Sequence, residues 1–247
     1  MTVLEKRFAP PELDLHRIPR HVALMMDGNR RWAKRHSLPP MMGHWEGANV
    51  LMDVVKASAE LGVETLTVYA FSTENWSRSE EEVEALMNIL EFYLLHKQEM
   101  MEQEGVRLQT IGDVARLPFR CQAAIASAKQ RTALCNRINL VLAVNYGGRD
   151  EIRRAISKIL ARHDQEKITP QQLTEDFIAS HLDTAPYGDP DLLIRPSGEL
   201  RVSNFLLWQI SYAEIYTTQV LWPDFSPKHL YEALLEFQAR SRRKGAC

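Results

Sequence analysis

The strongest constraint on the fold is an alternation along the chain between short apolar runs and longer segments with helical periodicity. The short runs are rich in β-branched residues, and they lie at 21–27, 63–71, 106–112, 138–146, 191–195 and 216–221. The helical segments lie between and after them, at 44–61, 79–104, 118–134, 149–163, 170–182 and 227–243. This order predicts an α/β fold with a central, largely parallel six-stranded sheet flanked by helices. Ser79 with Glu82 forms a capping box, and Gly62 and Gly105 mark the expected ends of two helices.

The chain is long enough to bury one sizeable core. It has 247 residues, 45% of them hydrophobic, and no Pro-rich or Gly/Ser-rich linker divides it. Residues 1–20 carry three prolines and show no clear period, so they are predicted to form an N-terminal arm on the surface. Residues 21–247 are then expected to form a single domain.

Charge and cysteine content exclude several classes of function. A formal charge of -2 argues against a general nucleic-acid-binding surface, so no nucleic-acid partner is expected. Cys121, Cys135 and Cys247 are odd in number and lack Cys-x-x-Cys spacing, which indicates neither a disulfide framework nor a zinc site. The sequence has no apolar signal region and no apolar run of about 20 residues, the length that crosses a bilayer. These features predict a cytoplasmic location.

Two distant stretches, 26–32 and 194–205, concentrate arginine among residues that allow tight turns. The first follows an apolar run and leads into helix-forming residues, so its glycine and free amides are expected where a strand ends and a helix begins. A helix N-terminus with guanidinium groups beside it binds anions well, which predicts phosphate binding. Asp27 would repel a phosphate unless a divalent cation lay between them. We therefore expect Asp27 to be a Mg²⁺ ligand.

Four polar segments follow predicted strands directly. They are Asp27, 72–76, 145–149 and 195–203. Ligands of open parallel sheets collect at the carboxyl ends of the strands, so these segments are predicted to share one cleft.

The helix expected over 79–104 is unusually apolar. Between Val83 and Leu95, ten of thirteen residues are apolar, and the exceptions, Glu84, Asn88 and Glu91, form one narrow polar stripe. Taken alone, this pattern favours core packing combined with a subunit interface. The alternative is one wall of a hydrocarbon tunnel, for a ligand with a phosphate head and an apolar tail.

These motifs together resemble the cis-prenyltransferases, and among them the undecaprenyl diphosphate synthases of bacteria. The similar segments run in the family's order and lie at 26–33, 43–44, 69–78, 145–149, 194–199, 201–209, 212–214 and 222–225. The resemblance implies the family's fold, with a hydrophobic tunnel beside the sheet. It also implies successive condensation of isopentenyl diphosphate onto an allylic diphosphate, usually farnesyl diphosphate, to give a long polyprenyl diphosphate such as undecaprenyl diphosphate. That product is a precursor of the lipid carrier for cell-wall glycan synthesis.

The resemblance further implies Mg²⁺ as cofactor, a homodimer, and at most peripheral membrane contact for product release. Carried over by position, Asp27 is the essential carboxylate at the metal and Asn75 the position assigned as proton acceptor. Glu214 is a second metal-binding carboxylate, which in the family comes from the neighbouring subunit. The implied allylic diphosphate site comprises Gly28, Asn29, Arg30, Arg31, Trp32 and His44. The implied cleft wall comprises Ser72, Thr73, Glu74, Trp76 and Arg78. The implied isopentenyl diphosphate pocket comprises Arg195, Arg201, Val202 and Ser203.

Some alternatives remain open at this stage. Arg30 stands where the family often has glycine, and Pro40 stands where close relatives usually have a phosphate-binding arginine. Individually, His44 could cap a helix, and Arg78 could pair with Glu81 or Glu82 at the surface. An all-helical trans-prenyltransferase is disfavoured because the chain has no Asp-Asp pair, and a nucleotide-binding protein because Gly-x-Gly-x-x-Gly and Gly-x-x-x-x-Gly-Lys are absent. A non-catalytic isoprenoid-binding subunit would be expected to have lost Asp27 or the second arginine motif. The sequence leaves the product length and the preferred primer undetermined.

Overall fold

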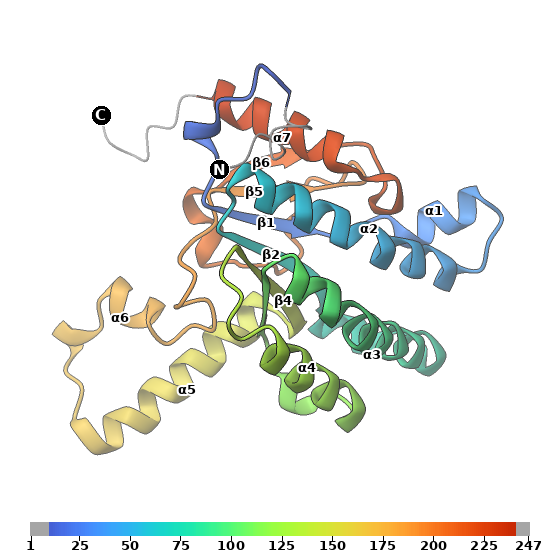
Figure 1. Cartoon of the computed structure of the whole chain (residues 1–247). Helices are drawn as coiled ribbons and strands as arrows, with labels where there is room; N and C mark the ends of the chain where they lie inside the picture. The colour runs from blue at the N-terminus through green and yellow to red at the C-terminus, as the bar shows by residue number, and fades with distance from the viewer. Residues whose placement is uncertain (1–9, 241–247) are drawn as a thin grey trace.

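The computed structural model describes residues 10–240 and contains one six-stranded sheet in the order β3-β4-β2-β1-β5-β6, with every neighbouring pair parallel. The predicted α/β fold and parallel sheet are therefore confirmed (Figure 1). The strands are β1 (His21–Met25), β2 (Thr65–Ser72), β3 (Val106–Ile111), β4 (Ile138–Tyr146), β5 (Leu192–Arg195) and β6 (Glu214–Thr217). The helices are α1 (Asn29–Arg35), α2 (Pro40–Leu61), α3 (Glu80–Gln103), α4 (Phe119–Arg131), α5 (Gly148–Glu166), α6 (Glu175–Ala179) and α7 (Pro227–Ala239).

Two of the predicted elements differ from those observed. The helix expected over 170–182 is a 3-10 turn followed by the short α6, because Thr174 leaves the helix to cap α6 by accepting from the Phe177 amide. The strand expected over 216–221 is β6, which begins and ends earlier. Thr218 and Val220 instead accept hydrogen bonds from the amides of Gly198 and Ser197, at 2.7 Å each. Their backbone therefore holds a turn beside β5 rather than extending the sheet.

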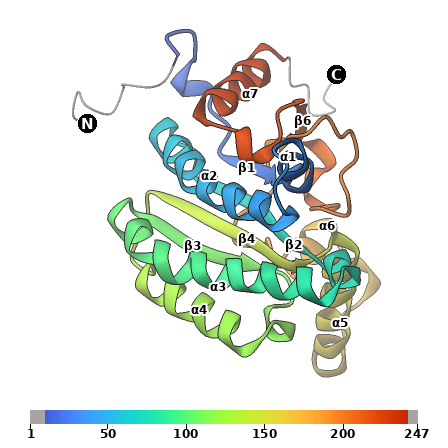
Figure 2. The same cartoon turned by 90° about the vertical axis from the view of Figure 1, so that its right-hand side faces the viewer.

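The sheet separates two apolar cores because successive side chains of each strand face opposite sides. On one face, Val22 and Leu24 pack beneath α2, α3, α4 and α7. Figure 2 looks onto α2 and α3, which run side by side across the sheet. On the other face, Ala23 and Met25 pack with Phe205 and Leu206 from the segment after β5. α5 and α6 extend away from the sheet together (Figure 1).

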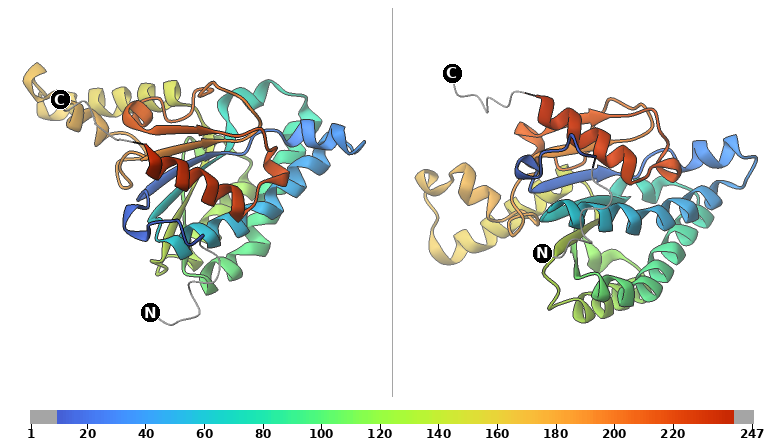
Figure 3. Two further views of the ribbon diagram at one scale, coloured as in Figure 1. Left: turned by 90° about the horizontal axis from the view of Figure 1, so that it is seen from above. Right: turned by 45° about the horizontal axis from the view of Figure 1, so that its top comes forward.

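The N-terminal segment lies against α7, which in turn packs on α2 and β6 (Figure 3). Leu13 is buried, and Arg17 donates to the Gln238 carbonyl oxygen at 2.7 Å. Residues 1–9 of the predicted arm, and the part of the last predicted helix beyond 240, lie outside the described residues. Between residues 10 and 240, every helix falls short of the length and apolarity that crossing a bilayer requires. Cys121 and Cys135 are free thiols, and Cys247 lies outside this range.

Candidate active site

The turn after β1 is shaped by Asp27 and Gly28. Gly28 has a φ of 101°, and a Cβ there would lie 2.9 Å from the Leu221 side chain, so the position requires glycine. The Gly28 amide donates to Asp27 Oδ1 at 2.7 Å, and α1 begins at the next residue. This confirms a strand-to-helix turn that carries Asp27 at the carboxyl end of the sheet.

Arg195 ends the neighbouring strand β5 and approaches the same turn. Its Nη2 donates to Asp27 Oδ2 at 2.9 Å, and its Nη1 donates to Ser203 Oγ at 3.0 Å. The Arg195 side chain is 4% exposed, whereas that of Asp27 is 32% exposed. A buried guanidinium thus meets a carboxylate that still faces solvent on one side. Arg195 Nε is buried without a hydrogen-bond partner among the described residues.

A second pair of arginines shares one carboxylate. Arg31 Nη2 lies 3.2 Å from Glu199 Oε1, and Arg201 Nη1 donates to Glu199 Oε2. Arg31 also donates to the Ser197 carbonyl oxygen at 3.0 Å. The two arginine stretches singled out in the sequence therefore meet at one place.

A third cluster surrounds Glu82 at the start of α3. Arg78 donates to Glu82 at 2.7 Å, Arg30 lies 3.8 Å from it, and His44 Nε2 lies 4.0 Å from it. Arg78 thus forms an ion pair with Glu82, one of the pairings considered from the sequence, but Glu82 lies at the site and not on the open surface. Burial, helped by the positive charge of Arg78, lowers the pKa of His44 to about 4, so the ring is neutral near pH 7. His44 Nε2 and Asn29 Oδ1 are both buried without hydrogen-bond partners among residues 10–240.

The loop after β2 is held by its own side chains. Asn75 Oδ1 accepts from the Ser72 amide at 3.1 Å, which closes a capping box. Trp76 Nε1 donates to Asn145 Oδ1 at 2.8 Å. Glu74 Oε1 accepts from Asn204 Nδ2 at 2.7 Å. Because the Asn75 carbonyl is already engaged, the side chain presents its NH₂ group as the free end.

These segments border a cavity of ≈ 330 Å³ that runs between α2, α3 and the sheet. Its polar end is lined by Asp27, Asn29, His44, Ser72, Asn75, Arg78, Arg195, Arg201 and Ser203. Its apolar wall includes Leu86, Met87, Ile89, Leu90 and Tyr93 of α3. Of the four segments expected to share one cleft, Asp27, 72–76 and 195–203 contribute to this cavity, whereas no residue of 145–149 lines it. The cavity has a cationic mouth and an apolar interior, which suits an anionic head with a hydrocarbon tail.

The polar stripe of α3 has a partner on α4. Arg120 binds Glu84 at 2.6 Å and Glu91 at 3.1 Å, and it also donates to Asn88. This pairing turns the stripe away from the cavity and leaves an apolar side of α3 facing into it. Phe92 stays 46% exposed on the outside. α3 therefore packs on the core and also walls a cavity, while the subunit interface and the hydrocarbon ligand stay predictions.

Several predicted residues do not line the cavity. Gly28, Arg30, Arg31, Trp32, Thr73, Glu74, Trp76 and Val202 lie around it rather than on its wall. Trp32 directs its Nε1 to Asp224 at 2.7 Å. Glu214 begins β6 at the amino end of the strands, where it accepts from Arg240 at 2.9 Å. Within one chain, Glu214 therefore lies at the amino ends of the strands, whereas Asp27 lies at their carboxyl ends.

Two asparagines that were not predicted as site residues connect the loops. Asn204 donates to Glu74, and its own Oδ1 accepts from the Arg149 amide at 2.9 Å. Its φ of 62° is in the left-handed region, which asparagine tolerates better than most residues. Asn145 Oδ1 accepts a hydrogen bond from Trp76 Nε1, and Asn145 Nδ2 donates to the Asp113 carbonyl oxygen at 2.9 Å. Both lie in motifs visible in the sequence, but only the fold shows which loops they join.

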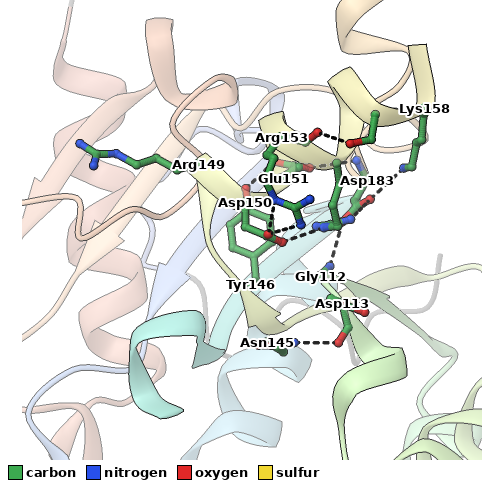
Figure 4. Close-up of polar contacts among 12 residues, drawn as sticks. Gly112, Asp113, Asn145, Tyr146, Arg149, Asp150, Glu151, Arg153, Lys158 and Asp183 are labelled. Atoms are coloured by element: carbon green, nitrogen blue, oxygen red, sulfur yellow. Dashed lines mark hydrogen bonds and ion pairs between the residues drawn. The ribbon is translucent and has the colours of Figure 1, made fainter. Parts of the chain in front are cut away.

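A buried carboxylate, Glu151, holds the segment that follows β5 against α5. Glu151 is 1% exposed and accepts from Tyr146 Oη at 2.5 Å and from Gln209 Nε2 at 2.9 Å. Burial raises the pKa of Glu151, and these two donors act against the rise. Figure 4 shows Tyr146 with Glu151 and the Asp113–Asn145 contact, while Arg149 points away from them. Gln209 belongs to the segment that carries Arg201 and Ser203, so Glu151 anchors that segment to α5.

The donor set at Asp27 fits a weakly held Mg²⁺. Among residues 10–240, no group of three or more His, Cys, Asp or Glu side chains is arranged to bind a metal. Mg²⁺ commonly uses one or two carboxylates together with water and substrate phosphates. Asp27 offers one partly exposed carboxylate at the cation-rich mouth, which matches a metal completed by diphosphate oxygens.

Comparison with known proteins agrees with this geometry. A family model described as putative undecaprenyl diphosphate synthase matches residues 25–245. The chain is 47% identical over 235 residues to an isoprenyl transferase of Chlamydia pneumoniae, covering 94% of each chain. It is 45% identical over 234 residues to an isoprenyl transferase of Clostridium tetani, covering 95% of this chain and 92% of the relative.

Two solved structures are also similar. Lavandulyl diphosphate synthase from Lavandula x intermedia, in complex with dimethylallyl diphosphate, matches with a TM-score of 0.90 and 37% identity. A probable undecaprenyl diphosphate synthase from Campylobacter jejuni matches with a TM-score of 0.77 and 32% identity. Each match covers 92% of this chain and 98% of the other.

Proposed function

The chain belongs to the undecaprenyl diphosphate synthase family of isoprenyl transferases, and from that premise we propose that it adds isopentenyl diphosphate repeatedly to an allylic diphosphate. The observation that carries the proposal is the cavity, which joins a mouth with three arginines to an apolar interior. An amphiphile with a diphosphate head fits both ends. Farnesyl diphosphate is the proposed primer, and a long polyprenyl diphosphate of the undecaprenyl type, a lipid-carrier precursor for cell-wall glycans, is the proposed product.

The size of the cavity supports a primer of this class. An apolar cavity of about 150 Å³ holds one benzene molecule, so by proportion the whole cavity, its polar mouth included, holds on the order of 13 heavy atoms. The apolar part therefore suits the tail of a short primer and is far too small for an undecaprenyl chain. A long product therefore requires the cavity to widen between α2, α3 and the sheet.

The proposed roles follow from the contacts at the mouth. Arg31 and Arg78 face the growing negative charge as the allylic diphosphate leaves, and such preorganised donors lower the barrier where charge develops. Arg195, Arg201 and Ser203 hold the head group of isopentenyl diphosphate. Asp27 holds Mg²⁺, which when bound supplies neutralising charge to the diphosphate oxygens. Asn75 is a weak base as a neutral amide, so its free NH₂ group orients a phosphate oxygen or water.

A homodimer is part of the proposal. Tyr212 is 72% exposed and Ile215 is 43% exposed, and both lie at the edge of the sheet next to Glu214. Apolar side chains there suit contact with a second copy. Glu214 would then leave Arg240 and contribute its carboxylate to the partner's site. We also propose a cytoplasmic enzyme that makes peripheral membrane contact when product leaves.

The direct test uses the purified chain with Mg²⁺, farnesyl diphosphate and labelled isopentenyl diphosphate. Labelled polyprenyl products of increasing length are expected. Omitting the primer should abolish the products, which shows that the labelled units are added to the allylic diphosphate. If the pure chain binds both substrates but yields no lipid product until another protein is added, it is a non-catalytic binding subunit and the proposal is wrong.

A further inference from the structure

Glu199 lies between the two arginine segments and engages one arginine from each. One of its oxygens is 3.2 Å from Arg31 and the other accepts from Arg201. Arg31 belongs to the segment after β1, and Arg201 belongs to the segment after β5. The Glu199 side chain is 25% exposed, and it lies beside the mouth, in contact with Arg201 of the cavity lining.

Both guanidinium groups can readily change partner. Arg31 and Arg201 keep 45% and 66% of their side-chain surface exposed. Carboxylate and phosphate oxygens accept from arginine with the same paired geometry. A diphosphate that takes the paired geometry on either arginine therefore competes with Glu199 for the same N–H donors.

We propose that Glu199 couples the two diphosphate subsites, by holding Arg31 and Arg201 while both are empty and releasing them together when one is filled. This inference rests on the proposed function, in which Arg31 serves the allylic diphosphate and Arg201 serves isopentenyl diphosphate. A diphosphate at Arg31 repels the Glu199 carboxylate, because like charges at short range disfavour each other. Arg201 then loses its competing partner and is free for the second substrate.

The expected size of the effect is modest. Ion pairs between exposed side chains contribute little, so release of one such pair changes a dissociation constant by up to about fivefold. Coupling between two binding sites is reciprocal, so the gain must appear whichever ligand is added first. This reciprocity separates coupling from a fixed order of binding.

Glu82 provides a matched control on the same mouth. It contacts Arg78 and Arg30 and lies near His44, and none of its contacts reaches Arg201. Removing the charge of Glu82 should release only Arg78 and Arg30 from their ion pairs. Glu82→Gln should therefore tighten binding of an allylic ligand without changing the coupling between ligands.

The test is calorimetric titration of the full chain with Mg²⁺, using unreactive farnesyl thiolodiphosphate and isopentenyl diphosphate, each alone and each in the presence of the other. In the parent protein, each ligand should bind several-fold tighter when the other is present. In Glu199→Gln, each ligand alone should bind about three- to fivefold tighter, and the mutual enhancement should fall by the same factor. Inorganic pyrophosphate alone should show the same gain. Glu199→Ala serves as a second variant, and thermal melting of each variant checks that it is folded.

The opposite results would overturn the inference. If Glu199 only positions the arginines, both variants should bind each ligand more weakly and keep the mutual enhancement. Unchanged binding in the folded variants also rejects it. In either case, continued synthesis of labelled polyprenyl by the parent protein leaves the proposed function standing, whereas a parent that binds neither ligand rejects both.

Discussion

The carboxylate of Asp27 lies 2.9 Å from the guanidinium of Arg195, although 168 residues separate them in the chain. Asp27 follows β1 by two residues and Arg195 ends β5, and these strands are neighbours in the sheet. The parallel arrangement therefore delivers an anion and a cation to the same point. Arg195 is buried, so Asp27 compensates its charge while leaving one side open to solvent.

Asp27→Asn should lower elongation by on the order of 10²- to 10³-fold, because the variant loses the charge that holds Mg²⁺ at the diphosphate. The amide keeps an acceptor oxygen for Arg195, so the protein should remain folded. Incorporation of labelled isopentenyl diphosphate measures the loss. Asp176→Asn, on α6, is the matched control and should retain full activity. Elongation by Asp27→Asn at the parent rate would contradict the assigned role.

His21 should make the fold sensitive to mild acid. Burial lowers its pKa to about 4, while its ring bonds the Gly188 carbonyl oxygen and Thr67 Oγ1. The unfolded chain therefore binds the proton more readily, and stability falls as the pH drops from about 6.5 towards 4. At pH 5 the loss is about 2 kcal/mol from this group.

Urea unfolding at pH 7.5 and pH 5 measures that loss. His21→Gln has no titrating ring, so its change in stability between the two pH values should be about 2 kcal/mol smaller than in the parent protein. His44→Gln, whose ring has a pKa lowered to a similar value, should show a comparable reduction. Equal pH dependence in the parent and both variants would show that other groups govern acid sensitivity.

Much of the site follows from the sequence because strand ends are visible in it. Apolar runs locate β1 and β5, and a parallel sheet must place Asp27 and Arg195 at one edge. The capping residues Ser79 and Glu82 likewise locate the start of α3, since Glu82 donates its amide to Ser79 Oγ. These features depend on local pattern and on the direction of strands.

What the sequence does not show is the pairing of side chains across loops. Asn204 joins Glu74 to the Arg149 amide only because a left-handed backbone turns it between them. Glu199 stands in a recognised motif, but its bridge between two arginines depends on how two loops fold together. The end of β6 was misplaced for the same reason, because Thr218 and Val220 bond a turn instead of a strand.

Asn75→Asp should separate orientation from proton abstraction. The carboxylate can still accept from the Ser72 amide, but the variant loses the free NH₂ group. If Asn75 orients a phosphate oxygen or water, kcat should fall by about 10²-fold, and KM should rise because the new carboxylate repels the diphosphates. Steady-state kinetics with each substrate varied gives both constants. A variant that turns over as fast as the parent would exclude any such role for Asn75.

Tyr93 should limit the length of the product. Tyr93 is the last residue of α3 that lines the cavity, and Leu51 is the last residue of α2 that does so. The two side chains therefore close the end of the cavity farthest from Asp27. The Tyr93 hydroxyl is buried and has no hydrogen-bond partner among residues 10–240. Tyr93→Ala should shift products to longer chains because it enlarges the closed end. Chromatography of labelled products measures the shift, and Phe92→Ala, on the outside of α3, is the control. An unchanged product distribution in Tyr93→Ala would place the limiting wall elsewhere.

Product release should limit steady turnover. Each five-carbon unit drawn into the apolar cavity is stabilised by at most roughly 4 kcal/mol, taking about 0.8 kcal/mol per CH₂. Because that gain accumulates with every addition, the finished chain binds far more tightly than the primer. We expect a burst in the first turnover followed by a slower steady rate, and we expect detergent or lipid vesicles to raise only the steady rate. Rapid-quench measurement of single and multiple turnovers distinguishes these phases. If the two rates are equal and neither detergent nor vesicles change them, chemistry limits the enzyme and the apolar wall of α3 does not retain the product.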